Sequence, residues 1–91
     1  MSVVIVGGNE CMVRRYKEIC DEYHCKSKVF PKMDGALKGI GSPDLLVLFT
    51  GTVSHKMVRS TLNETKGKDI KIVRCHTSSA SALRNILSQH A

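Results

Sequence analysis

Aromatic residues are scarce in this chain of 91 residues, which contains two Tyr, two Phe and no Trp. Proteins that bind single-stranded nucleic acids stack the bases on aromatic side chains, so the scarcity argues against that function. Long hydrophobic runs are also missing, since no stretch approaches the roughly 20 apolar residues of a membrane-spanning helix. The apolar start at Val3–Val6 is too short for a secretory leader. We therefore expect a cytoplasmic protein that binds neither membranes nor nucleic acids.

Acidic residues are outnumbered, with eight Asp and Glu against fourteen Lys and Arg and a formal net charge of +6. Such a balance favours anionic partners. Because the basic residues are spread along the chain rather than clustered, we expect a small anionic ligand and not a nucleic-acid duplex. A chain of this size buries only about 60–65% of its unfolded surface. Its core is therefore thin, and we expect a homodimer to add stability.

Cysteine is present, but its spacing is not that of a zinc site. The four cysteines are Cys11, Cys20, Cys25 and Cys75, and none forms a CxxC pair. This spacing argues against a structural zinc knuckle, and a chain without a leader is expected to keep its thiols reduced. Cys20 lies on the apolar side of a predicted helix and is expected in the core. Cys25, like His24 and His90, is expected at the surface or at an edge.

The stretch VVIVGGN at residues 3–9 predicts how the fold begins. Residues 2–6 form one buried strand, Gly7 and Gly8 end it, and Asn9 caps a helix over residues 10–23. An apolar strand followed by glycines and a capped helix is typical of a parallel α/β sheet, in which the turn faces the ligand. The full dinucleotide fingerprint is missing, because Met12 stands where the third glycine would be.

The remaining pattern alternates strands and helices. Strands are predicted at 27–30, 45–49 and 70–74, helices at 55–65 after Ser54 and in the last segment after Ser78 or Ser79, and a weak helical turn or ordered loop at 32–41. The apolar run at 45–49 suits a central strand covered on both faces. Right-handed crossovers then give an α/β fold of the Rossmann-like or flavodoxin-like kind. We expect one domain over residues 1–91, a four-stranded parallel sheet in the order 2-1-3-4, and helices on both faces.

In such a sheet the ligand lies beyond the carboxyl ends of the strands. The loops expected there are 7–11, 31–35, 50–55 and 74–79. They carry Gly7, Gly8, Asn9, Cys11, His55, Cys75, His76, Thr77, Ser78 and Ser79, with Arg14, Arg15 and Arg74 close by. Three predicted helix N-termini point at the same region, which is an arrangement suited to anions.

Known catalytic patterns are missing from these loops. A phosphotransfer receiver would place Asp at the end of the third strand, where Phe49 stands. A cysteine phosphatase would place Arg six residues after its Cys, but Ser81 follows Cys75 and Lys17 follows Cys11 at that spacing. No GxSxG elbow, Walker loop or carboxylate pair occurs in the loops. We therefore expect a binding protein rather than an enzyme.

What remains is a set of thiol and imidazole donors above a basic rim, which suits iron or copper and haem in particular. We expect haem b, with metal ligands drawn from His55, Cys75, His76 and Cys11, and with arginines pairing with the propionates. These arginines are Arg14, Arg15 and Arg74. Each donor could also be an ordinary surface or packed residue, and the serines could simply cap helices.

Two alternatives stay open from the residues alone. One is a phosphate-binding or nucleotide-binding regulatory module, in which Gly7, Gly8 and Asn9 together with residues 77–79 cradle the phosphate. The other is a cysteine-dependent phosphoryl-transfer component with Cys11 as the nucleophile.

Three segments resemble a bacterial family of uncharacterised, Rossmann-like single domains: VVIVGGNE at 3–10, DLLVLFTGTVSH at 44–55 and SSASALRNIL at 78–87. The most specific element is the Val-Ser-His at 53–55. The resemblance implies the fold, and it implies haem binding with a redox or oxygen response for small cysteine-bearing members. Many members carry histidines after the second strand, where this chain has PKMDG at 31–35, so those ligands are missing here.

Overall fold

The computed structural model describes residues 1–31 and 41–90. The elements in chain order are β1 (Ser2–Val6), the 3-10 helix η1 (Glu10–Met12), α1 (Val13–Glu22), β2 (Lys26–Phe30), β3 (Leu45–Phe49), the 3-10 helix η3 (Thr50–Thr52), α2 (His55–Thr65), β4 (Lys71–Cys75) and α3 (Ala80–His90). The weak helical turn predicted at 32–41 falls almost wholly outside the described residues. Within them, no helix combines the length and apolar character needed to cross a membrane.

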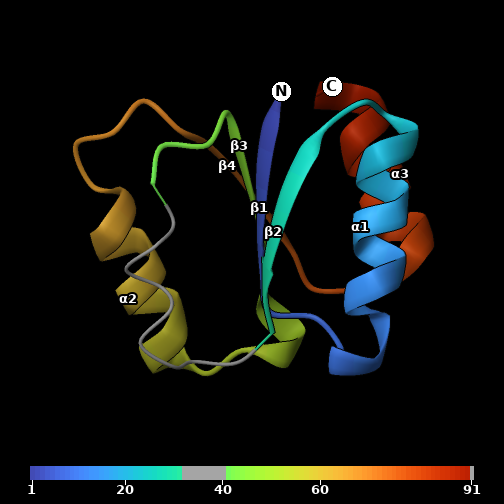
Figure 1. Ribbon diagram of the computed structural model, residues 1–91. Helices are drawn as coiled ribbons and strands as arrows, with labels where there is room; N and C mark the ends of the chain where they lie inside the picture. The colour runs from blue at the N-terminus through green and yellow to red at the C-terminus, as the bar shows by residue number, and fades with distance from the viewer. Residues whose placement is uncertain (32–40, 91) are drawn as a thin grey trace.

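The four strands form one parallel sheet in the order β2-β1-β3-β4 (Figure 1). This confirms the predicted α/β fold, strand order and parallel direction. Since all strands run the same way, their carboxyl ends share one edge of the sheet, which we call the carboxyl edge. It lies at the bottom of Figure 1, and the loops after β1, β3 and β4 leave the sheet there.

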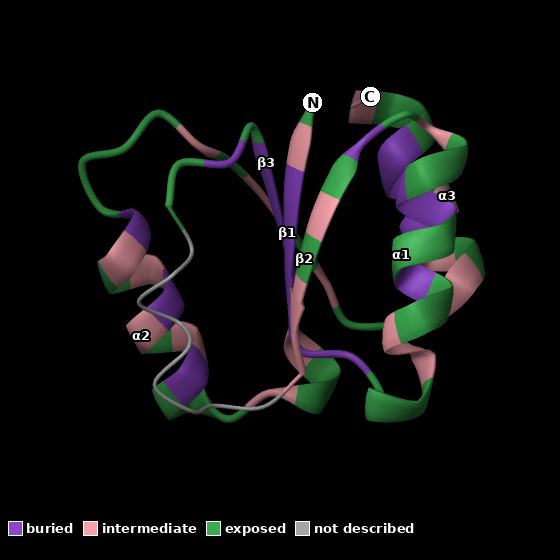
Figure 2. Ribbon diagram, in the orientation of Figure 1, coloured by how far each residue is buried: buried purple, intermediate pink, exposed green. Residues whose placement is uncertain are grey.

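Helices cover both faces of the sheet, as predicted. On one face α1 and α3 lie side by side, and α2 lies on the other (Figure 1). Side chains along β1 and β3 alternate between two apolar clusters, so Val3 and Ile5 pack toward α1 and α3 while Val4 and Val6 pack toward α2. All five residues of β3 are buried (Figure 2), as expected for a central strand with helices on both sides.

Each helix buries the residues that recur at intervals of three or four positions along it. Tyr16, Ile19 and Cys20 are buried on α1, Met57 and Thr61 on α2, and Leu83, Ile86 and Leu87 on α3. Helix α2 also begins and ends at the predicted residues, and the hydroxyl oxygen of Ser54 accepts the Met57 N–H at 3.2 Å. In α3 the cap is Ser79, whose hydroxyl accepts the Ala82 N–H at 3.1 Å.

Some predicted boundaries are wrong by one to three residues. Residues 10–12 form a 3-10 turn rather than the start of the α-helix, with Asn9 as its cap, and α1 begins only at Val13. The fourth strand runs to Cys75, which was expected in the following loop. The shift matters for the site because Cys75 is held in the sheet by pairing with Phe49.

Cys25 is buried, with 3% of its surface exposed, so its predicted surface position is wrong. The cause is the way α1 ends. His24 adopts a left-handed φ of 57°, the Cys25 N–H donates to the Cys20 carbonyl at 2.9 Å, and the His24 N–H donates to the Asp21 carbonyl at 2.9 Å. This is a Schellman motif, which brings the residue after the left-handed position back against the helix. Cys25 therefore packs in the same cluster as Cys20.

Candidate functional site

Two glycines follow β1 at the carboxyl edge, where other parts of the protein pack closely against their backbone. Gly7 and Gly8 have φ values of 91° and 90°, where other residues are strained. A Cβ on Gly8 would lie 2.7 Å from the Tyr16 ring, and one on Gly7 would lie 3.0 Å from the Phe49 carbonyl oxygen. The turn therefore needs glycine at both positions for its backbone conformation and for its packing.

The amides of this turn donate inside the protein. The Gly7 N–H donates to the Phe30 carbonyl at 2.9 Å, and the Gly8 N–H donates to the Thr52 hydroxyl at 2.7 Å. The Thr52 hydroxyl in turn donates to the Phe49 carbonyl at 3.1 Å. The loop after β1 is thereby tied to the loop after β3.

Two further amides of the loop, those of Asn9 and Cys11, are also engaged. The Asn9 side-chain oxygen accepts the Cys11 N–H at 3.0 Å, and the Asn9 N–H donates to the Tyr16 hydroxyl at 3.3 Å. A phosphate cradled by Gly7, Gly8 and Asn9 would have to displace these internal bonds. The anion-binding alternative therefore loses the free main-chain donors that it would take from residues 7–9.

Tyr16 ties the loop after β1 to the loop after β4. Its side chain is fully buried, its ring centre lies 5.6 Å from that of Phe49, and its hydroxyl donates to the Ser78 carbonyl at 2.6 Å. The same hydroxyl accepts the Asn9 N–H. Tyr16 was not singled out from the sequence, yet a buried tyrosine needs a partner for its hydroxyl. That requirement is the signal that could have placed it at the site.

The loops after β3 and β4 also touch one another. A Cβ on Gly51 would lie 3.1 Å from His76 Cε1 and 3.2 Å from His76 Nδ1, and it would press on the His76 carbonyl oxygen. Gly51 therefore leaves the space in which the His76 main chain and imidazole rest. Neither Gly51 nor Thr52 was singled out from the sequence, and no local pattern marks a glycine whose neighbour is far away in the chain.

Four donors were predicted as metal ligands, and two of them are neighbours in the sequence rather than residues that the fold brings together. Cys75 and His76 are adjacent at the end of β4, where the Cys75 thiol donates to the Thr77 carbonyl at 3.2 Å and His76 is exposed. Cys11 and His55 are exposed at the same edge. They lie at the starts of helices on opposite faces of the sheet, however, because Cys11 comes just before α1 and His55 is the first residue of α2.

The described part of the chain holds no group of three or more His, Cys, Asp and Glu side chains that could ligate a metal ion. A bare zinc or iron ion needs three or four protein ligands. The carboxyl edge, as far as it is described, therefore suits a metal only if the metal brings most of its ligands with it.

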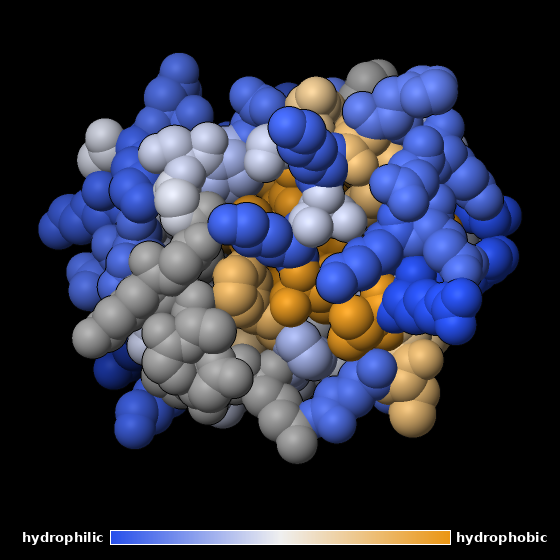
Figure 3. All heavy atoms as spheres, viewed as in Figure 1, coloured by the Kyte–Doolittle hydropathy of each residue, from blue (hydrophilic) through white to orange (hydrophobic). Residues whose placement is uncertain are grey.

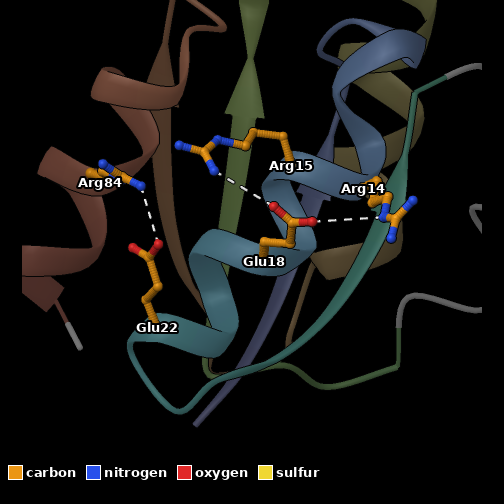
Figure 4. A network of polar contacts seen from close by, with 5 residues as sticks. All are labelled: Arg14, Arg15, Glu18, Glu22 and Arg84. Atoms are coloured by element: carbon orange, nitrogen blue, oxygen red, sulfur yellow. Dashed lines mark hydrogen bonds and ion pairs between the residues drawn. The ribbon is translucent and has the colours of Figure 1, made fainter.

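The predicted arginines divide between two places. On α1, Arg14 Nε lies 3.6 Å from Glu18 Oε1 and an Arg15 terminal nitrogen lies 3.5 Å from Glu18 Oε2 (Figure 4). These exposed ion pairs are weak and could exchange for a ligand. Arg74 is exposed on β4 next to Cys75 and His76, so it is the arginine nearest in sequence to the two adjacent donors.

Residues 77–79 have structural contacts as well. The carbonyls of Thr77 and Ser78 accept from Cys75 and Tyr16, and the Ser79 hydroxyl caps α3. The loop after β2 was the fourth predicted loop of the site, and beyond Pro31 it lies outside the described residues. The part of the site that can be assigned thus comes from β1, β3 and β4.

A family model described as an uncharacterised protein conserved in bacteria, DUF2325, matches residues 2–90. The match confirms that the chain resembles an uncharacterised bacterial family. No curated protein matches the chain, and no solved structure does.

Proposed function

The chain belongs to DUF2325, an uncharacterised bacterial family, and we propose from its own residues that it is a small haem-binding protein with a redox-responsive role. The observation that carries the proposal is the pair at the end of β4. An exposed imidazole, His76, rests against Gly51, and the partly buried Cys75 precedes it in the chain at the end of the strand. Imidazole and thiolate are both established protein donors to haem iron.

Haem suits this edge better than a bare metal ion does. The porphyrin supplies four ligands to iron, so one or two protein donors are enough. Among residues 1–31 and 41–90, side chains that could ligate a metal do not gather in groups of three. Arg74 is exposed two residues before His76, and a guanidinium is a good partner for a haem propionate.

The redox role rests on Cys75. Its thiol is partly buried and donates to the Thr77 carbonyl in the loop that carries His76. A thiol one residue away from His76 can replace the imidazole as a ligand of the iron, or it can become oxidised itself. Haem, when bound, would supply the redox-active iron, while Cys75 and His76 would hold it and Arg74 would orient it.

Haem titration followed by absorbance tests the proposal. We expect the wild-type protein to give a Soret band that saturates at one haem per chain. His76→Ala should weaken binding by roughly tenfold or more, the effect of losing one protein ligand to the iron that is worth about 1.4 kcal/mol or more. His90→Ala is the matched control, because His90 ends α3 at the opposite edge of the sheet. A wild-type protein without a Soret band, or equal effects of the two variants, would contradict the proposal.

Cys75→Ser separates binding from the redox role. If the thiol ligates iron or responds to its oxidation state, this variant should still bind haem but should change the ferric spectrum or the reduction potential. The exposed Cys11 provides a control, since Cys11→Ser should leave both unchanged. An unaltered spectrum and potential in Cys75→Ser would leave a haem protein without the proposed redox function.

A further inference from the structure

In the part of the chain that the structure describes, β2 and β4 are the outer strands of the sheet, and the hydrogen-bond pattern shows which of their backbone groups point outward. On β2, the Lys26 N–H donates to the Met1 carbonyl at 3.0 Å and the Phe30 carbonyl accepts from Gly7. Backbone groups alternate along a strand, so Ser27 and Val29 point away from β1. None of the hydrogen bonds formed within residues 1–31 and 41–90 satisfies these outward groups.

The same reasoning applies to β4 at the other edge. The Lys71 N–H donates to the Asp44 carbonyl of the neighbouring strand at 3.4 Å, and Lys71 pairs with Leu45. Ile72 and Arg74 therefore point their N–H and C=O groups outward. Each edge thus offers two residues to an added strand, and the side chains decide which edge can pair with itself.

Lysines protect the β2 edge. Lys26 and Lys28 are exposed, and hydrophilic side chains lie across the apolar centre of this face (Figure 3). Antiparallel pairing of two β2 strands about Ser27 would place each Lys26 opposite a Lys28, and pairing about Lys28 would place that lysine opposite itself. Pairing about Val29 would place Ser27 opposite Pro31, which has no N–H to donate. Like charges directly opposite one another destabilise a strand pair, and edge lysines are a known protection against self-association.

The β4 edge carries no such conflict. Pairing about a two-fold axis at Val73 would place Val73 opposite Val73 of a second copy, Ile72 opposite Arg74, and Lys71 opposite Cys75. No like charges then face one another, and the outward groups of Ile72 and Arg74 exchange hydrogen bonds. Ile72 and Val73 are both partly exposed, so the contact also buries apolar surface on each face of the sheet.

We propose that the protein forms a homodimer in which the β4 strands of two copies pair antiparallel about Val73, giving one continuous eight-stranded sheet. The chain is small, and its core buries a modest share of the surface. An isologous contact of this kind satisfies the backbone of β4 and removes its open edge in both copies at once. The inference does not depend on haem binding, because it uses only the edge strands.

Sedimentation equilibrium of matched arginine variants tests the dimer. Val73 and Val29 are both partly buried valines on edge strands, and both pack against the core cluster under α1 and α3. Val73→Arg would place like charges opposite one another and should weaken the dimer by roughly tenfold or more. Val29→Arg should leave the dimer intact. A monomeric wild-type protein, or a dimer weakened by Val29→Arg and not by Val73→Arg, would overturn the proposal.

A cysteine variant tests the register and stays informative if Val73→Arg fails to fold. Residues that face each other in a non-hydrogen-bonded antiparallel pair have Cα atoms about 4.5 Å apart, which lies within the range for a disulfide. Val73→Cys should therefore form a reducible dimer under mild oxidation, with a disulfide between the introduced thiols of the two copies identified by mass spectrometry. Val29→Cys should form none at its own position. Failure of Val73→Cys to form this disulfide would contradict the register about Val73.

Discussion

At the scale of single residues, Tyr16 does most to hold the described part of the candidate site together. Through a single hydroxyl it contacts the loops after β1 and β4, and its ring is the reason that Gly8 has no room for a Cβ. A position of this kind couples two loops that are more than sixty residues apart in sequence. Its hydroxyl should therefore stabilise the protein in addition to the packing of its ring.

Tyr16→Phe tests that coupling. The ring remains in place, while the Ser78 carbonyl and the Asn9 N–H lose their partner, so we expect the free energy of unfolding to fall by about 1–2 kcal/mol. Urea denaturation measures the loss. Tyr23→Phe is the control, because the Tyr23 hydroxyl makes only a 3.4 Å contact with the Arg84 carbonyl. Equal losses in the two variants would mean that Tyr16 acts through its ring alone.

The buried thiol of Cys20 makes the free energy of unfolding depend on pH. Burial raises the pKa of its thiol from 9.0 to about 11, although a hydrogen bond with Ser27 works in the opposite direction. Between those two pH values the unfolded chain loses this proton and the folded chain keeps it. The free energy of unfolding should therefore fall as pH rises from 9 toward 11, by about 1.4 kcal/mol for each unit of the shift.

Cys20→Ala should remove this contribution, so its stability should depend less on pH in that range than the stability of the wild-type protein does. Cys11→Ala should keep the wild-type dependence, since Cys11 is exposed. Urea denaturation below pH 9 and near pH 11 provides the comparison. Identical slopes for the wild-type protein and Cys20→Ala would show that the buried thiol does not control this range.

At the scale of elements, α1 ends on an unfavourable residue. The Schellman motif places His24 at a left-handed φ of 57°, a position that glycine fills more readily. His24→Gly should therefore stabilise the protein by about 0.5–1 kcal/mol, the relief of left-handed strain being partly offset by the greater freedom of glycine in the unfolded chain. Thermal unfolding measures the gain. The matched change Lys28→Gly on β2 should destabilise, because glycine weakens a strand interior.

Periodicity predicts elements well and their ends less well. The β1 and β3 strands and α2 have the expected limits because residues that end or begin such elements flank them. These are the two glycines after β1, Pro43 and Asp44 before β3, and the Ser54 cap before α2. The 3-10 turn at 10–12 was missed because Asn9 caps either kind of helix. Cys25 was misplaced because a Schellman motif is usually marked by glycine, and here the left-handed residue is His24.

At the scale of the whole molecule, the sheet order could be predicted and the contacts across its carboxyl edge could not. Alternation of strands with helices and right-handed crossovers leaves few topologies, so the loops after β1, β3 and β4 were identified correctly. Which side chains meet there depends on contacts such as Gly51 with His76 and Gly8 with Thr52. Those contacts join residues far apart in sequence, and no local pattern specifies them. The separation of the Cys11 and His55 segments likewise follows from the faces on which α1 and α2 lie.

The proposed β4 contact has a consequence for the stability of the whole molecule. If two copies share one sheet, unfolding releases two chains, and mass action makes the dimer more stable as the protein becomes more concentrated. The apparent free energy of unfolding should rise by about 1.4 kcal/mol per mole of dimer for each tenfold increase in concentration. Differential scanning calorimetry across such a series should therefore show a rising Tm for the wild-type protein and for Val29→Arg. Val73→Arg should show a smaller rise in Tm over the same concentrations, and a constant Tm for the wild-type protein would mean that the folded unit is the monomer.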